Sequence, residues 1–161
     1  MEKAYAFVET FMQQRDIELI HAKDCPAFWV DWREFDEDIA DYCHIDGLTA
    51  ETCDADNDLG YDLFFSYKGR KTQVLFEEEE ITRDPALQAI NRVIMPEYEL
   101  RFMTDTLGGD VLAFIVLEGQ GWQTLAAKYG KDALDSHFLP ITDDTAMFGL
   151  SFGEVIQSIN A

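Results

Sequence analysis

Basic side chains are scarce in this chain: 12 Lys and Arg residues stand against 32 Asp and Glu residues, for a formal net charge of −20. Binding to nucleic-acid phosphates requires clustered Lys and Arg side chains, so the composition argues against direct nucleic-acid binding. Anionic lipids would repel the same acidic surface, which argues against a membrane-surface protein. We therefore expect partners other than nucleic acids and membranes.

Long apolar runs and paired cysteines are lacking as well. The longest apolar run, Val111 to Leu117, has seven residues, whereas a membrane-spanning helix needs roughly 20. Charged side chains interrupt the amino-terminal segment, where a secretory signal would need an apolar core. The three cysteines form no Cys-x-x-Cys motif, which favours reduced thiols and a cytoplasmic location. They are Cys25, Cys43 and Cys53.

Apolar and aromatic side chains are present in the amounts that a folded protein needs. They make up 47% and 13% of the residues, whereas disordered chains of high net charge are poor in aromatics. A chain of 161 residues is long enough for one ordinary hydrophobic core. We therefore expect a single globular α+β domain over residues 1–161, built on a mainly antiparallel sheet.

Hydrophobic periodicity predicts where the elements of this domain lie. Strands are expected near 61–67, 72–77, 97–103 and 111–117, with a hairpin turn at 68–71 and a short strand at 17–20. Helices are expected near 3–15, 28–43, 85–95, 121–130 and 151–160. The helix over 28–43 depends on the spacing of Phe28, Trp32, Phe35 and Ile39. A short strand over 28–32, leading into a shorter helix, is the alternative.

The acidic side chains are concentrated between Asp31 and Asp62. This segment carries twelve carboxylates and one basic residue, Arg33, and hence a net charge of −11. A helix over 28–43 would place four of the carboxylates on its solvent face as a rigid acidic patch; they are Asp31, Glu34, Asp38 and Asp41. Such a patch attracts cationic partners. Trp29 and Trp32 are candidate aromatic anchors for a partner, although Trp32 fits the core better.

In size, acidity and α+β pattern, the chain resembles bacterial immunity proteins, which neutralise the toxins of competing cells. The resemblance implies an inhibitory protein that binds a basic toxin or nuclease. Charge complementarity between the two surfaces would speed their encounter and enforce specificity. The sequence therefore predicts an acidic protein-binding or inhibitory protein, with the acidic patch and Trp29 as its contact residues.

A small-ligand- or metal-binding enzyme that uses the acidic loop at 54–62 is the alternative. Asp54, Asp56 and Asp58 have the spacing of the first, third and fifth ligands of a calcium loop. Leu59 stands where an EF-hand loop needs glycine, and Phe65 stands where it needs glutamate. The segment is therefore either a looser calcium site or a solvated acidic loop before the strand at 61–67.

Three other patterns favour structural roles. The run Gly149-Leu150-Ser151-Phe152-Gly153 spells a nucleophile elbow, but no histidine follows it, and Ser151 with Glu154 forms a capping box for the last helix. Among the histidines and cysteines, only His21 and Cys25 approximate the paired spacing of a zinc site, which needs two such pairs. Glu77 to Glu80 is a solvated loop or an extension of the acidic surface.

Overall fold

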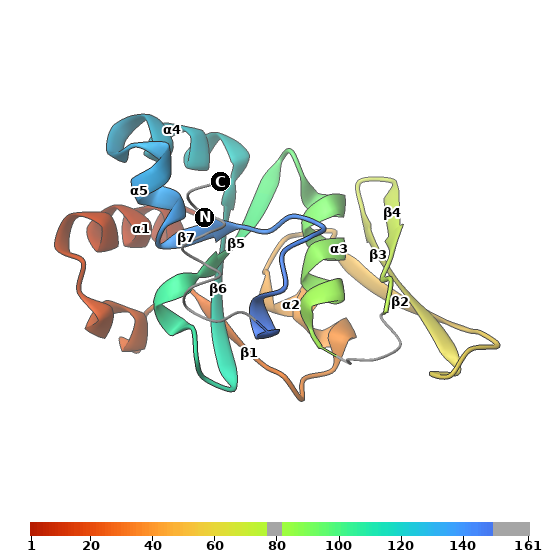
Figure 1. Cartoon of the computed structure of the whole chain (residues 1–161). Helices are drawn as coiled ribbons and strands as arrows, with labels where there is room; N and C mark the ends of the chain where they lie inside the picture. Colours follow the sequence, from red (N-terminus) through yellow and green to blue (C-terminus); the bar gives the residue numbers. More distant parts are fainter. Residues whose placement is uncertain (77–81, 150–161) are drawn as a thin grey trace.

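The computed structural model describes residues 1–76 and 82–149. Within them the strands form two antiparallel sheets (Figure 1). The four-stranded sheet has the order β1-β6-β5-β7, with β1 at Phe28–Asp31, β5 at Tyr98–Met103, β6 at Val111–Glu118 and β7 at Phe138–Pro140. The three-stranded sheet has the order β2-β3-β4, with β2 at Thr49–Asp54, β3 at Tyr61–Tyr67 and β4 at Arg70–Gln73. The expected α+β class with antiparallel pairing is confirmed, although the strands divide between two sheets.

Helices lie on both sides of the four-stranded sheet (Figure 1). The helix α3, Asp84–Ile94, lies between the two sheets and contacts β3, β4 and β5. The opposite face carries α1 (Glu2–Gln14), α4 (Gly119–Tyr129) and α5 (Lys131–Asp135). The short α2, Ile39–Tyr42, contacts α3 and β2. The remaining elements are short 3₁₀ helices: η1 at Ile17–His21, η2 at Asp36–Asp38, η3 at Thr104–Thr106 and η4 at Met147–Gly149.

The strand β6 divides the hydrophobic core in two. Alternate side chains of a strand point to opposite faces, and here both faces of β6 are covered. Leu112, Phe114 and Val116 pack in the cluster that holds α3 and β3. The side chains between them pack in the cluster of α1 and α4. The strand expected near 111–117 is therefore a central strand of the sheet, with apolar layers on both of its faces.

The helix α3 has almost no solvent face, because a sheet lies on either side of it. Nine of its eleven residues are buried, and Asp84 and Pro85 are its first two residues, where a carboxylate and a proline are both favourable. The carboxylate of Asp84 accepts hydrogen bonds from the backbone N–H groups of Met147 and Phe148. That contact holds η4 against the first turn of the helix.

Most of the expected elements are confirmed. They are the helices near 3–15, 85–95 and 121–130 and the strands near 61–67, 97–103 and 111–117. The expected strand at 72–77 lies earlier, as β4, because Lys68 and Gly69 both take positive φ values in a two-residue hairpin loop. The expected strand at 17–20 is instead the 3₁₀ helix η1, whose start is capped by Asp16. The helix expected at 151–160 lies outside the described residues.

The helix expected over 28–43 is wrong. Residues 28–31 form β1, which pairs with β6 and buries Val30 opposite Leu112. Only the short η2 and α2 follow, as in the alternative of a strand leading into a shorter helix. The regular spacing of Trp32 and Phe35 with the other apolar residues is coincidental, because both side chains are exposed.

Candidate functional site

The predicted acidic patch is spread over β1, α2 and the segment between them, because Asp31 ends β1 and Asp41 lies on α2. Glu34 and Asp38 lie on residues 32–38, which lead from β1 towards α2 and which we call the acidic aromatic loop. The pairing of β1 with β6 fixes where it starts, because Asp31 lies opposite Val111 and the Trp32 N–H donates to Asp110 O at 3.3 Å. The loop lies at the lower edge of the molecule in the view of Figure 1. It thus leaves the sheet with a defined direction.

A buried ion pair holds the loop on the protein. Arg83 Nη1 lies 3.0 Å from Asp36 Oδ2, and the two residues are 7% and 4% exposed. The same guanidinium donates a hydrogen bond to the backbone carbonyl of Glu34. Burial raises the pKa of Asp36 to about 6, although Arg83 opposes the rise. Asp36 Oδ1 and Arg83 Nε have no hydrogen-bond partner in the described part of the chain.

The structure brings three of the four predicted carboxylates together around one phenol. The Tyr42 hydroxyl donates to Glu34 Oε2 at 3.0 Å. That hydrogen bond, then burial, then the charges of Glu34, Asp38 and Asp41 raise the pKa of Tyr42. The three acids come from the loop, from η2 and from α2, not from one long helix as expected.

The fourth carboxylate, Asp31, forms a local pair with the only basic residue of the segment. Arg33 Nη2 lies 2.7 Å from Asp31 Oδ2, and hydrogen bonds from the side chain and backbone of Arg33 lower the pKa of Asp31 to about 2. Arg33 therefore compensates Asp31 and leaves the carboxylates around Tyr42 without a nearby cation from this segment. Asp110, on the turn before β6, adds a further exposed acid beside the loop.

Two large aromatic side chains of the loop face solvent. Trp32 is 51% exposed and Phe35 is 70% exposed, and the Arg33 guanidinium lies 5.6 Å from the Trp32 ring centroid. The expectation that Trp32 belongs to the core is wrong. Trp29, the anchor proposed from the sequence, is partly buried and stacks on His21 with 5.5 Å between the ring centroids.

Trp32 and Phe35 follow the end of β1 at Asp31 and lie outside the sheet. Each lies between two charged or acidic residues, in the runs Asp31-Trp32-Arg33 and Glu34-Phe35-Asp36. The helical spacing of these two residues with other apolar residues concealed their exposure in the sequence.

The acidic loop at 54–62 is organised by an asparagine. Asn57 Nδ2 donates to Tyr61 O at 3.1 Å and to Asp62 Oδ1 at 3.0 Å, and Asn57 Oδ1 accepts from the Leu59 N–H. Asp54 ends β2, and the exposed Asp56 and Asp58 follow in the loop. Within residues 1–76 and 82–149, no three His, Cys, Asp or Glu side chains are grouped so that they could hold a metal ion.

A separate cavity of about 300 Å³ lies between the start of α1, the segment before β1 and the end of α2. Cys25, Cys43 and His44 line it, together with apolar side chains, whereas Cys53 is exposed on β2. Burial raises the pKa of Cys25, and it raises that of Cys43 to about 12. Both thiols are therefore protonated at neutral pH and are poor nucleophiles. The residues that line the cavity do not include the 54–62 loop.

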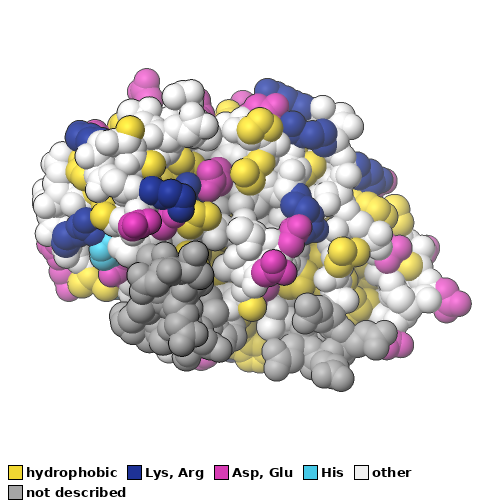
Figure 2. All heavy atoms as spheres, turned by 45° about the horizontal axis from the view of Figure 1, so that its top comes forward, with side chains coloured by type: hydrophobic (Ala, Val, Ile, Leu, Met, Phe, Trp, Pro, Cys, Tyr) yellow, Lys and Arg dark blue, Asp and Glu magenta, His cyan; other side chains and the backbone are white. Residues whose placement is uncertain are grey.

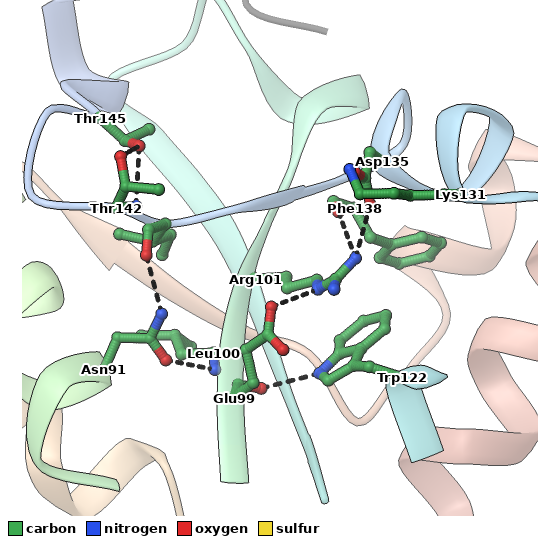
Figure 3. Close-up of polar contacts among 11 residues, drawn as sticks. Asn91, Glu99, Leu100, Arg101, Trp122, Lys131, Asp135, Phe138, Thr142 and Thr145 are labelled. Atoms are coloured by element: carbon green, nitrogen blue, oxygen red, sulfur yellow. Dashed lines mark hydrogen bonds and ion pairs between the residues drawn. The ribbon is translucent and has the colours of Figure 1, made fainter. Parts of the chain in front are cut away.

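A mostly buried polar network on the other side of the sheet is structural in character (Figure 3). Arg101 donates to Glu99 Oε1 and to Asp135 Oδ1, both at 2.8 Å. Its guanidinium lies 4.4 Å from the ring centroid of Trp122, whose indole N–H donates to Glu99 O at 2.9 Å. These contacts join β5 to α4 and α5. They also show that the carboxylates of Glu99 and Asp135 balance the charge of Arg101.

Charges of both signs are interspersed on the face of the molecule shown in Figure 2. The Lys and Arg side chains there form several separate groups, with Asp and Glu side chains near them. Two sequence patterns, the run Glu77 to Glu80 and most of the 149–153 motif, lie outside the described residues. None of the helices in the described ranges combines the length and apolarity needed to cross a membrane.

Comparisons with known proteins add no family to this description. No protein-family model matches the chain, and neither the curated proteins nor the solved structures compared with it give a match.

Proposed function

We propose that the protein binds a basic partner protein through the acidic aromatic loop and thereby inhibits it. The observation that carries the proposal is the exposure of Trp32 and Phe35 on a loop surrounded by carboxylates. Large aromatic side chains dominate the binding energy of many protein interfaces. Two of them on one short loop are a natural centre for an interface.

The surrounding charges select the kind of partner. Glu34, Asp38 and Asp41 cluster around Tyr42, and Arg33 is paired with Asp31. A partner with clustered Lys or Arg side chains would be steered to this surface and would bind in a defined orientation. A partner with an acidic surface would be repelled. The active-site face of a nuclease or of a similar toxin has the required positive charge.

The anchoring of the loop supports binding without a large ordering cost. Arg83 holds both the Asp36 carboxylate and the Glu34 carbonyl from inside the protein. An interface loop that is already held in place loses less conformational freedom on association. Together with the resemblance in size and acidity, these features support an immunity protein that acts in the cytoplasm. The three cysteines, all free thiols, suit that compartment.

The proposal is tested with the proteins encoded beside this gene, since an immunity protein and its toxin are expected to be neighbours. Binding of each purified basic candidate is measured by surface plasmon resonance at several salt concentrations. Trp32→Ala and Phe35→Ala should each raise the dissociation rate by roughly tenfold or more, as interface anchors do. Changing Glu34, Asp38 and Asp41 to Lys together should lower the association rate and reduce its salt dependence.

Leu75→Ala is the matched control, because Leu75 is also a large exposed apolar residue, at 68%, but lies beyond β4. It should leave both rates unchanged. Circular dichroism of every variant checks that the fold is retained. If Trp32→Ala, Phe35→Ala and the triple Lys variant bind the partner as wild type does, the acidic aromatic loop is not the interface.

A further inference from the structure

The strand β2 forms a free edge of the three-stranded sheet. It pairs with β3 on one side, from Thr49 opposite Ser66 to Asp54 opposite Tyr61, and with no strand of the described residues on the other. Edge strands expose a row of unpaired backbone groups that can pair with a further chain. Natural edges often carry lysine, proline or a bulge that prevents such pairing, and β2 has the sequence Thr-Ala-Glu-Thr-Cys-Asp.

The register shows which backbone groups of β2 point to the free edge. Leu63 O accepts a hydrogen bond from Val74 N at 2.8 Å, so the backbone groups of Leu63 point towards β4. Thr52 lies opposite Leu63 and is therefore in a non-hydrogen-bonded pair, with its own N–H and C=O directed away from β3. Because this pattern has a period of two, the groups of Asp54 point the same way. Ala55 N donates to Gly60 O, which agrees with that register.

The outward part of this edge is open. Thr52, Cys53 and Asp54 are all exposed, and the outward backbone groups of Thr52 and Asp54 have no partner among the hydrogen bonds of the described residues. The hairpin of β2 and β3 projects from the body of the molecule, at the right of Figure 1. A segment of another protein can therefore approach the edge from solvent.

The charges beside the edge select its occupant. Glu51 is bound to Lys71 of β4 at 2.7 Å, whereas Asp54 and the following Asp56 and Asp58 form no ion pair with a described cation. A second copy of β2 would place like charges against one another, which opposes pairing between two copies of this chain. Lys or Arg side chains on an added strand would instead meet Asp54.

We propose that β2 accepts an extended, basic segment of a partner protein as an added strand, through the outward backbone groups of Thr52 and Asp54. Main-chain hydrogen bonds supply affinity in this mode of recognition, and side chains at alternate positions supply specificity. We call this edge of β2 the strand acceptor. It rests on the proposed function for the positive charge of the partner, and it adds that the bound segment of the partner is an extended strand. The edge adjoins the proposed interface, because η2 contacts β2.

The test uses the whole protein and a synthetic seven-residue peptide of alternating Lys and Val residues. Amide hydrogen exchange is followed residue by residue by nuclear magnetic resonance. The amides of Thr52 and Asp54 should exchange roughly tenfold more slowly when the peptide is added, because they become hydrogen-bonded. The amides of Glu51 and Cys53 should not change, since they point towards β3 and are already bonded.

Thr52→Pro removes the outward N–H group while leaving the ladder between β2 and β3, which Thr52 does not join. Proline is tolerated in an edge strand at such a position. The variant should keep its fold and lose peptide protection at Asp54, whereas Thr52→Val, the matched control, should keep it. An unchanged peptide response in a folded Thr52→Pro variant would overturn the strand acceptor.

The outcomes separate this site from the acidic aromatic loop. Peptide-induced shifts at residues 32–38 without protection at Thr52 and Asp54 would overturn the strand acceptor and leave the proposed function standing. Protection at the edge, combined with unaltered partner binding by the loop variants, would support the strand acceptor and contradict the loop as the interface. A concentration-dependent dimer that protects the same amides would show that the occupant is a second copy, and so would overturn the proposal.

Discussion

Asp36 brings a carboxylate into the protein interior beside Arg83. Burial raises its pKa to about 6, whereas in an unfolded chain an aspartate titrates near pH 4. The native state therefore binds this proton more tightly than the unfolded state does. The contribution of Asp36 to the free energy of unfolding is therefore full below about pH 4 and is lost as the pH rises through about 6.

Asp36→Asn should remove this contribution to the pH dependence of stability. The free energy of unfolding of the wild type, minus that of the variant, should fall by up to about 3 kcal/mol between about pH 4 and pH 6. Urea unfolding at a series of pH values measures this difference. Asp38→Asn is the control, because Asp38 is exposed in the same 3₁₀ helix, and its curve should run parallel to that of the wild type. Parallel curves for all three proteins would contradict the burial of an ionisable Asp36.

At the scale of single elements, Asn91 joins the central helix to two other parts of the chain (Figure 3). Its Nδ2 donates to Ile141 O and its Oδ1 accepts from the Leu100 N–H, both at 2.9 Å. Asn91 is only 2% exposed. If its amide is removed, Ile141 O and the Leu100 N–H therefore cannot bond to water instead. The side chain thus fixes α3 against β5 and against the segment that follows β7.

Asn91→Ala should lower the free energy of unfolding by about 2–4 kcal/mol, because it leaves two buried backbone groups unpaired. Chemical denaturation with an unchanged denaturant slope measures the loss. Arg92→Ala is the matched control on the next position, where the side chain forms an exposed ion pair with Asp143; it should cost less than about 1 kcal/mol. Equal losses in the two variants would show that the buried amide contributes no more than a surface contact.

The elements that the sequence predicted are those whose apolar pattern matches their burial. The run Val111 to Leu117 is apolar throughout and, after the exposed Val111, is buried on both faces, so its pattern leads directly to a central strand. The strand β2 escaped prediction because its residues are mostly exposed and therefore carry no apolar alternation. The strand β7 has only three residues, and α5 only five, too few for a period to be recognised.

The sequence predicted which charged residues make up the candidate site, but not how the fold arranges them. The carboxylates of residues 31–41 were evident from the sequence, and the structure gathers Glu34, Asp38 and Asp41 around Tyr42. Their arrangement depends on β1 pairing with a strand more than eighty residues later in the chain and on Arg83 reaching Asp36. Long-range contacts of this kind leave no local spacing in the sequence. The exposed Trp32 and Phe35 were misplaced for the same reason.

At the scale of the whole molecule, the excess of acidic residues opposes the compact state. The net charge of −20 on 161 residues produces mutual repulsion, which folding increases by bringing the charges closer together. Most of the described carboxylates lie outside the ion pairs that Lys and Arg side chains form among the described residues. Salt should therefore stabilise the protein by screening.

Raising sodium chloride from about 0.05 M to about 0.5 M should raise the melting temperature, by about 3 °C for each 1 kcal/mol of repulsion that is screened. A variant with Asp38, Asp41, Asp56 and Asp58 changed to Asn should melt higher than the wild type in low salt and respond less to added salt. Differential scanning calorimetry measures both effects. The variant also controls for general salt effects on folding, which act on both proteins. A melting temperature that falls with salt would contradict net repulsion.

The position of α3 between the two sheets has a consequence for the order of events during synthesis. The three-stranded sheet is complete at Gln73, yet Leu63, Phe65 and Tyr67 lack the cover of α3 until that helix, which ends at Ile94, has left the ribosome. Translation adds about 5–20 residues per second, so this apolar face stays uncovered by α3 for a few seconds on the nascent chain. The apolar face of α1 stays uncovered for longer, because the strand that covers it, β6, ends only at Glu118. The amino-terminal half is therefore made before the elements that bury it, and the nascent protein is most exposed to aggregation and to chaperones over that interval.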